Sequence, residues 1–241
     1  EEGAERAEGE EEKENEATER QDGDSEGERP QNVVIEIDSN VYTYRRRKKM
    51  SDEDVMVCQC VPKQGEAGCG ENCLNRMLCI ECIDDHCPCG AKSFLNPNKG
   101  SVCINQQFQK KQYATLEKIK CGAKGWGLQA VHALKAGAFV TEYCGEVLDE
   151  AGHLERKQKY MARGQRHYYF MTLSSHEVID ACRKGNLGRF TNHSCDPNCE
   201  TQKWLVRGDL CIGLFALRDI AAGEELTFDY NFERYGDTPM R

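Results

Sequence analysis

The sequence has no apolar run long enough to cross a membrane. None of its segments reaches the roughly 18 consecutive apolar residues that a transmembrane helix needs, so we expect no membrane partner. The N-terminus, Glu-Glu-Gly-Ala, also lacks the basic and then apolar stretch of a secretory signal. A secreted or membrane-spanning protein is therefore not predicted.

Charge of one sign is concentrated at the N-terminus. The 241 residues include 41 Asp and Glu and 32 Lys and Arg, a formal net charge of −9. Residues 1–30 alone hold 14 acidic and 4 basic residues, so the remaining chain is near neutral, which neither demands nor excludes nucleic acid. Because residues 1–32 have little apolar surface to offset chain entropy, we expect a disordered acidic tail.

Five consecutive cations, Arg45-Arg46-Arg47-Lys48-Lys49, follow a short possible strand at 33–37. Such a run is a patch that contacts phosphates, a nuclear-import signal, or simply a solvated charged loop. The sequence does not decide between these. We expect residues 33–57 to be a basic linker.

Nine of the 15 cysteines lie within residues 58–103, which contain few large aliphatic residues. The odd total and the tight pairs Cys58-Gln59-Cys60 and Cys87-Pro88-Cys89 argue against a disulfide framework. Cysteines this close converge well on zinc, and the metal would replace an apolar core. A reducing compartment follows. Composition leaves open two separate four-cysteine sites, two zincs sharing one of seven thiolates, or a three-zinc cluster of nine.

Residues 113–232 show short strand patterns separated by turns. Segments 139–143, 168–173 and 177–180 are rich in β-branched and aromatic residues. Segments 204–206 and 210–212 flank Arg207-Gly208-Asp209, which predicts a hairpin. A helix is predicted over about 149–162, ended by Gly164. The fold class is therefore mostly β, of α+β type.

Five motifs follow one another in this part of the chain: Lys124-Gly125-Trp126-Gly127, Glu142-Tyr143-Cys144-Gly145-Glu146, His167-Tyr168-Tyr169-Phe170, Arg189-Phe190-Thr191-Asn192-His193-Ser194-Cys195 and Glu225-Leu226-Thr227-Phe228-Asp229-Tyr230. Together they resemble the SET domain of protein lysine methyltransferases. The cysteine spacing resembles the AWS (associated with SET) module. With residues 195–204 and Phe228, these features resemble the subclass acting on lysine 36 of histone H3.

The resemblance implies a fold and a domain order. The expected fold is a SET-domain β-clip with a pseudoknot, in which the C-terminal strand threads the segment around Asn192. A zinc-cluster AWS module over 58–108 would precede the SET catalytic domain over 109–232. Residues 233–241 would begin a post-SET segment.

The resemblance also implies two zinc ions in the AWS module. Its seven ligands would be Cys58, Cys60, Cys69, Cys73, Cys82, Cys87 and Cys103. Cys79 and Cys89 would be spare. Ser93 stands where the family usually has its last ligand, so we take 93–102 as a looped insertion, with Cys89 as the alternative to Cys103.

A third zinc is implied at Cys195, which in the family joins three post-SET cysteines. The sequence given ends at Met240-Arg241 without them. For residues 1–241 we therefore expect an open cofactor site or weakened activity. The other cysteines are expected to be buried small apolar residues: Cys121, Cys144, Cys182, Cys199 and Cys211.

Methyl transfer from S-adenosylmethionine requires a neutral lysine amine, and an apolar aromatic channel beside a sulfonium disfavours the ammonium form. The resemblance implies that Tyr230 is the main catalytic tyrosine and that Tyr143 and Tyr169 line the lysine channel. Phe228 would limit the methyl count. Because phenylalanine cannot hold the water that crowds out further methyl groups, we expect di- or trimethylation.

Cofactor contacts are implied for the segments around the first, third and fourth motifs. The residues are Lys124, Gly125, Trp126, His167, Tyr168, Tyr169, Arg189, Asn192 and His193. Glycine in such a loop lets the backbone approach a ligand closely.

The resulting hypothesis is a monomeric nuclear enzyme that di- or trimethylates lysine 36 of histone H3. Its partners would be the histone H3 tail, the nucleosome and, through Arg45–Lys49, nucleosomal DNA. The alternatives are a zinc-stabilised chromatin-binding module with little or no turnover, and a methyltransferase of a non-histone lysine. A degenerate domain should have lost Tyr230 or the Asn192-His193 pair, and this sequence keeps both.

Overall fold

A computed structural model describes residues 34–96, 100–165 and 168–230. The predicted tail at 1–32, the post-SET start at 233–241 and His167 lie outside the described residues. Part of the predicted insertion, 97–99, does so too. In the described part of the chain, no helix is long and apolar enough to span a bilayer.

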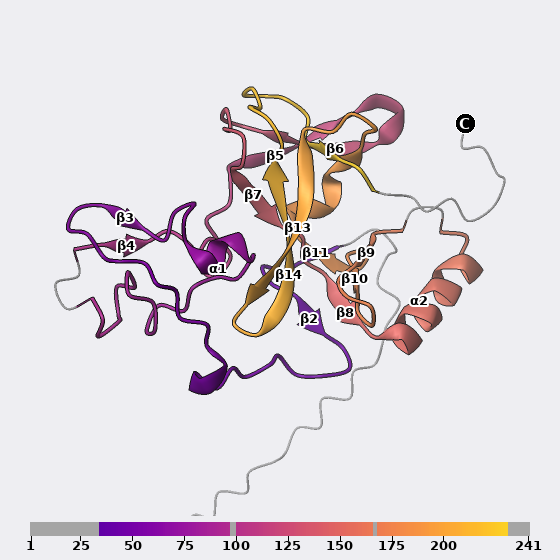
Figure 1. The fold of residues 1–241 in the computed structure, drawn as a ribbon. Coiled ribbons are helices and arrows are strands. Elements are labelled where there is room, and N and C mark those ends of the chain that lie inside the picture. The colour runs from indigo at the N-terminus through magenta and orange to yellow at the C-terminus, as the bar shows by residue number, and fades with distance from the viewer. Residues whose placement is uncertain (1–33, 97–99, 166–167, 231–241) are drawn as a thin grey trace, which may run out of the picture. The chain divides into compact units, whose positions relative to one another are not determined.

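The largest sheet has five strands in the order β12-β15-β13-β14-β7. Figure 1 labels three of them, β13, β14 and β7. The long hairpin of this sheet joins β13 and β14 through Arg207 and Gly208, whose φ angles of 50° and 86° suit a tight hairpin turn. The predicted hairpin is confirmed, with longer strands than the pattern indicated. The strands are β7 (Phe139–Glu142), β12 (Asn192–His193), β13 (Cys199–Val206), β14 (Asp209–Ala216) and β15 (Thr227–Phe228).

The C-terminal strand of this sheet is threaded. β15 lies between β12 and β13 and is parallel to both. Because residues 194–198 join β12 to β13, this connection crosses β15. The arrangement matches the pseudoknot that the family resemblance implies. An apolar cluster that includes Leu128, Leu214 and Leu226 surrounds Phe228.

A second sheet has the order β2-β8-β10-β9 and contacts helix α2 (Glu150–Ala162). The Asp149 side chain caps this helix by accepting the Gly152 N–H at 2.9 Å, and Gly164, with a φ of 68°, follows its end. The predicted helix is confirmed. The strands are β2 (Val41–Tyr42), β8 (Glu146–Leu148), β9 (Phe170–Thr172) and β10 (Val178–Asp180).

Residues 34–48 belong to the fold, although the sequence indicated a linker over 33–57. β1 (Ile35–Glu36) pairs in parallel with β11 (Lys184–Gly185), and β2 pairs in parallel with β8. The Asn40 side chain accepts the Gly145 N–H at 3.0 Å. These pairings join residues more than a hundred positions apart, so no local pattern predicts them.

The cysteine-rich region is built from short elements. They are β3 (Ala67–Gly68), α1 (Leu74–Met77), β4 (Val102–Cys103) and the 3₁₀ turn η1 (Asp52–Asp54). The region is tied to the large sheet, because the Glu81 N–H donates to the Leu205 carbonyl at 3.0 Å. The buried Glu81 carboxylate also accepts the N–H groups of Phe108 and Gln109, at 2.7 and 3.0 Å.

One further hairpin pairs β5 (Leu116–Lys120) with β6 (Trp126–Ala130). Its connection contains the 3₁₀ turn η2 (Gly122–Lys124). A third 3₁₀ turn, η3 (Leu187–Phe190), contacts both strands. The hairpin thereby brings the first motif, around Lys124, close to the fourth motif, which begins in η3.

Candidate metal centre and active site

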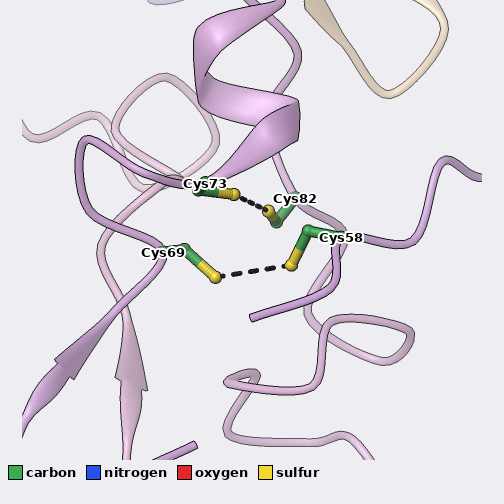
Figure 2. Close-up of side chains that lie close together, drawn as sticks. All are labelled: Cys58, Cys69, Cys73 and Cys82. Carbon is green, nitrogen blue, oxygen red and sulfur yellow. Dashed lines mark hydrogen bonds between the residues drawn. The ribbon is translucent and has the colours of Figure 1, made fainter. Parts of the chain in front are cut away.

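Cysteine sulfurs converge in the region of residues 58–103. Two groups of four have all their sulfur atoms within 4.8 Å of one another: Cys58, Cys69, Cys73 and Cys82; and Cys69, Cys82, Cys87 and Cys103. All six of these cysteines are buried. Figure 2 shows the first group, in which Cys69 and Cys73 come from the connection between β3 and α1, Cys58 and Cys82 come from other segments, and the side chains point toward one another.

The spacing of these sulfurs fits zinc. Four thiolates around one zinc, at about 2.3 Å each, are separated by about 3.8 Å. The Sγ–Sγ distances are 3.6 Å for Cys58 to Cys69 and 3.9 Å for Cys73 to Cys82. All 15 cysteines are free thiols.

Six of the seven predicted ligands are therefore brought together, Cys103 among them. Cys60 packs against this cluster, but its sulfur belongs to neither four-sulfur group of the described residues. Cys89 is buried against Gly68, where an added Cβ would lie 2.4 Å from the Cys89 Sγ. Cys79 packs elsewhere, beside the Phe108, Phe139 and Trp204 rings.

The cofactor loop predicted at Lys124–Trp126 lies against Asn192. The Asn192 side-chain amide donates to the Trp126 carbonyl at 3.3 Å and to the Glu225 carboxylate at 2.9 Å. Gly125 has a φ of 85°, which favours glycine. A Cβ on Gly127 would lie 2.4 Å from Cys121 Sγ and 3.0 Å from Asn192 Nδ2, so only glycine allows this approach. The first and fourth motifs thus form one site.

Glu225 is a site residue that the sequence analysis did not single out. Its carboxylate accepts from Asn192 and lies 3.9 Å from the Lys124 ammonium. It thereby connects the β5–β6 hairpin to the strand pair β12–β15. The signal in the sequence that could have identified Glu225 is its position as the first residue of the Glu225–Tyr230 motif.

The predicted catalytic tyrosine, Tyr230, lies at the end of the threaded strand. Its hydroxyl donates to the Thr191 carbonyl at 2.7 Å, and its backbone N–H donates to His193 Nδ1 at 3.2 Å. Its ring centroid lies 4.6 Å from that of Phe228. Burial, followed by the neighbouring Tyr169, raises the pKa of Tyr230 to about 12. The hydroxyl therefore stays protonated at neutral pH.

Tyr143 is fully enclosed beside Tyr169. Its hydroxyl donates to the Tyr169 carbonyl at 3.1 Å, and burial raises its pKa well above the ordinary value, with Tyr230 adding to the rise. Gly145 follows two residues later, where a Cβ would lie 2.6 Å from Ile179. Tyr143, Tyr169 and Tyr230, from three different motifs, thus form one cluster.

Two predicted cofactor residues, Arg189 and Tyr168, make their described contacts with residues outside the cofactor loop. Arg189 is buried with its guanidinium carbon 3.9 Å from the Tyr169 ring centroid. Tyr168 is exposed and stacks on Phe170, with centroids 5.9 Å apart. In the described residues neither contacts Lys124–Trp126 or Asn192 through a hydrogen bond or ring contact.

Cys195, the predicted ligand of a third zinc, is exposed with its Sγ 3.4 Å from His193 Nε2. Of the five cysteines predicted to be buried, Cys144, Cys199 and Cys211 are buried. Cys121 and Cys182 are only half-buried, which corrects that prediction. Both lie beside polar groups, since Cys121 packs on the cofactor loop and Cys182 accepts from Gln165 at 3.5 Å.

Two family models match this chain. A model described as "SET domain" matches residues 125–231, and a model described as "AWS domain" matches residues 64–93. The matched ranges lie inside the two domains predicted from the sequence.

Curated relatives are similar over most of this chain. It is 49% identical over 199 residues to "Histone-lysine N-methyltransferase ASHH2" of Arabidopsis thaliana, covering 82% of this chain and 11% of that protein. It is 48% identical over 208 residues to "Histone-lysine N-methyltransferase SETD2" of Homo sapiens, covering 83% and 8%. It is 46% identical over 195 residues to "Histone-lysine N-methyltransferase, H3 lysine-36 specific" of Chaetomium globosum, covering 79% and 21%. The chain thus spans only a small part of each relative.

Solved structures also resemble this fold. "Crystal structure of the Chaetomium Thermophilum polycomb repressive complex 2 (PRC2)" matches with a TM-score of 0.62 and 29% identity, covering 73% of this chain and 24% of that one. "ctPRC2 in an autoinhibited conformation bound to S-adenosylmethionine" matches with a TM-score of 0.62 and 29% identity, covering 72% and 24%.

Proposed function

Because this chain belongs to the SET-domain family and carries an AWS domain before its SET domain, we propose that it is a histone-lysine N-methyltransferase. The mostly β SET fold predicted from the sequence is confirmed. The proposed reaction is transfer of methyl groups from S-adenosylmethionine to lysine 36 of histone H3 in nucleosomes, giving the di- and trimethyl products. Names of similar proteins that specify histone H3 lysine 36 support this substrate.

The observation that carries the proposal is the cluster of Tyr143, Tyr169 and Tyr230. Burial raises the pKa of Tyr143 and Tyr230, so both hydroxyls stay protonated and neutral at physiological pH. Aromatic rings around a narrow channel exclude water and disfavour the ammonium form of an entering lysine. Neutral hydroxyls can still orient the amine through directed hydrogen bonds.

The groups at the reacting centre act through orientation. The Tyr230 hydroxyl donates a hydrogen bond to the Thr191 carbonyl, so the lone pairs of its oxygen remain available to accept a hydrogen bond from a lysine amine. When bound, S-adenosylmethionine supplies a methyl group on a positively charged sulfur. We assign its binding to Lys124–Trp126, Asn192 and His193, because Asn192 donates to the Trp126 carbonyl and His193 Nδ1 accepts the Tyr230 N–H.

For zinc we propose two ions held by the seven cysteines Cys58, Cys60, Cys69, Cys73, Cys82, Cys87 and Cys103. The two four-sulfur groups overlap at Cys69 and Cys82, which supports two adjacent ions; with Cys60 as the seventh ligand, one of these two thiolates would bridge the ions. The ions would stabilise the fold without taking part in the reaction.

The test of the proposed function is incubation of the protein with nucleosomes and S-adenosylmethionine, followed by mass spectrometry of histone H3. We expect di- and trimethyl lysine 36. Nucleosomes with arginine at this histone position are the control and should remain unmodified. Methylation of other lysines only would reject the assigned target, and absence of any methylation would reject the enzyme.

Phe228 offers a test of product specificity. Its ring is buried, packs against the Tyr230 ring and has no hydroxyl to bind water. Phe228→Tyr is expected to shift the products from di- and trimethyl toward monomethyl lysine, because a hydroxyl-bound water would occupy the space of an added methyl group. The measurement is the product distribution by mass spectrometry at equal total turnover. An unchanged distribution would contradict the role given to Phe228.

The basic run at 45–49 is divided by the structure. Arg45 forms ion pairs with Glu177 at 2.8 Å and Asp209 at 2.9 Å, so it secures the fold and is not available to a partner. Arg47 is exposed but donates to the Asn40 carbonyl at 3.1 Å, which leaves Arg46, Lys48 and Lys49 as the exposed side chains of this run without such a bond to the described residues. We propose that these three side chains contact nucleosomal DNA and that the protein acts in the nucleus as a monomer.

Replacing Arg46, Lys48 and Lys49 together by glutamine is expected to weaken nucleosome binding and to reduce its salt dependence. The slope of log K against log salt should fall in magnitude by about 2.7, since each phosphate contact contributes about 0.9. Arg45→Gln is the matched variant and should lower the thermal stability instead, because it leaves two carboxylates unpaired. A salt slope unaffected by the triple substitution would contradict the DNA contact.

A further inference from the structure

A buried guanidinium, that of Arg189, packs against the Tyr169 ring of the tyrosine cluster. Arg189 is 8% exposed, and its guanidinium carbon lies 3.9 Å from the centroid of the Tyr169 ring. Its Nε–H donates to the Ala181 carbonyl at 2.7 Å. No carboxylate of residues 34–96, 100–165 or 168–230 forms an ion pair with it. Burial of a charge without an opposite charge costs free energy, so we expect a role for the Arg189 guanidinium at this place.

The contacts of Arg189 converge on the same backbone as those of the tyrosines. The Ala181 carbonyl accepts from Arg189, and the Ala181 N–H donates to the Tyr169 carbonyl at 3.0 Å. That Tyr169 carbonyl also accepts the Tyr143 hydroxyl. The Arg189 stem fills the space over Gly185, where an added Cβ would lie 3.2 Å from its Cδ. Arg189 thus fixes the wall that Tyr169 forms.

The other ionisable groups near this wall do not cancel the charge. Asp180 is fully buried, accepts from the Tyr160 hydroxyl at 2.7 Å, and shares Arg156, at 3.1 Å, with the buried Glu146, at 2.8 Å. Lys184 lies 3.3 Å from Glu146, so two cations balance these two carboxylates. Burial, followed by Asp180, raises the pKa of the Cys182 thiol to about 12, so it is neutral. Tyr143 is also neutral. The guanidinium therefore leaves a net positive charge beside the channel.

We propose that Arg189 is a positioning residue of the lysine channel, which holds the Tyr169 ring and whose positive charge favours the neutral, reactive form of an entering lysine. The inference rests on the proposed function. At an effective dielectric constant of about 20, a second positive charge roughly 10 Å away shifts an ionisation by about one pH unit. The role differs from the cofactor contact that the family resemblance implies for Arg189.

The test compares a neutral variant with a charged one. Arg189→Gln keeps a hydrogen-bond donor for Ala181 but removes the charge, whereas Arg189→Lys keeps the charge but loses the flat stacking on Tyr169. The acid limb of the kcat–pH profile, which reports the lysine in the bound complex, should move up by about one pH unit in Arg189→Gln, a tenfold loss of kcat below the limb. Arg189→Lys should lower kcat equally at all pH values and leave the limb in place.

A second readout does not depend on turnover. With S-adenosylhomocysteine, whose sulfur is uncharged, the preference of the protein for a norleucine peptide over the matching lysine peptide should fall about tenfold in Arg189→Gln. Arg183→Gln is the control, because Arg183 is exposed on the same segment, and it should behave as the unaltered protein.

Several outcomes would overturn the inference. An unmoved acid limb and an unchanged peptide preference in folded Arg189→Gln would do so, as would equal limb shifts in the glutamine and lysine variants. Arg189→Met is the second neutral variant if the glutamine variant does not fold. Failure of both to fold, while Arg189→Lys folds, would show that the charge serves folding alone. Absence of methylation by the unaltered protein would reject the proposed function and this inference together, whereas normal methylation with an unmoved limb rejects only the inference.

Discussion

Tyr230→Phe is expected to lower kcat by a factor of about 10² to 10³, the usual effect of removing one hydrogen-bonding group at a reacting centre. The substitution removes a single oxygen, the one that donates to the Thr191 carbonyl at 2.7 Å. The phenylalanine ring can keep its packing against Phe228 and His193. Orientation of the lysine amine is therefore lost while the channel wall remains.

Stability separates this effect from general damage. A single net hydrogen bond is worth about 1 kcal/mol, so the melting temperature should fall by only about 2–4 °C. Affinity for S-adenosylmethionine, measured by calorimetry, should be nearly unchanged. Single-turnover methyl transfer measures the chemical step. A loss of less than tenfold in that step would contradict the assignment of Tyr230 as the main catalytic tyrosine.

The pH dependence of the unaltered protein follows from the same residue. Because burial and Tyr169 raise the pKa of Tyr230 to about 12, its hydroxyl keeps its proton over the working range. The rate should therefore rise with pH as the substrate lysine loses its proton, without a fall from ionisation of Tyr230 below about pH 11. A bell-shaped profile whose upper limb disappears in Tyr230→Phe would contradict the neutral hydroxyl.

Loss of zinc is expected to lower both the stability and the activity of the protein strongly. Cys82 belongs to both four-sulfur groups, and the side-chain amide of Asn105 donates to its sulfur at 3.3 Å. Cys82→Ser should therefore release at least one ion and weaken binding of the other. Structural zinc contributes about 10–16 kcal/mol in small domains, as much as the total stability of a typical protein. We expect the region 58–103 to unfold.

Activity should be lost with the metal, although no zinc touches the tyrosines. Glu81, the neighbour of Cys82 in the sequence, bonds to Leu205 on β13 and to the N–H groups of Phe108 and Gln109. Unfolding of the cluster would release these contacts with the large sheet. Zinc content by mass spectrometry, thermal unfolding and methyl transfer are the measurements, for Cys82→Ser and for the protein after chelation.

Cys89→Ser is the matched control, because Cys89 is equally buried but lies outside both four-sulfur groups. It should retain two zinc ions and most of the activity. Cys103→Ser should lose zinc. If Cys89→Ser loses zinc and Cys103→Ser keeps it, the ligand set proposed here is wrong. Cys60→Ser tests the remaining ligand, whose sulfur stands apart from the two groups.

Features encoded over a few residues could be predicted from the sequence. Asp149 caps a helix because its side chain reaches the Gly152 N–H, and Arg207-Gly208 turns a hairpin because both residues adopt positive φ. The spacing of Cys69 and Cys73 predicted that their sulfurs converge, and both belong to the first four-sulfur group. For the helix cap and the hairpin turn the chemistry is local, so no distant residue changes the result.

Other features depend on which distant segments meet. The parallel pairing of β1 with β11 and the insertion of β15 between β12 and β13 leave no periodic trace in the sequence. The five cations from Arg45 to Lys49 look alike, yet Arg45 alone pairs with Glu177 and Asp209. The sequence gives the charge of each residue, but only the folded structure shows which residue neutralises it.

The sequence by itself determined the chemistry of this protein, namely the thiols that suit zinc, the tyrosines that suit a lysine channel and the glycine loop that suits a cofactor. Only the tertiary structure decided how these groups meet. It placed the Arg189 guanidinium against the Tyr169 ring, brought the Cys103 sulfur into a four-sulfur group that does not include Cys89, and brought Glu225 to Asn192. The reason is physical, since side-chain chemistry belongs to single residues, whereas contacts between segments far apart are set by chain closure and packing of the whole fold.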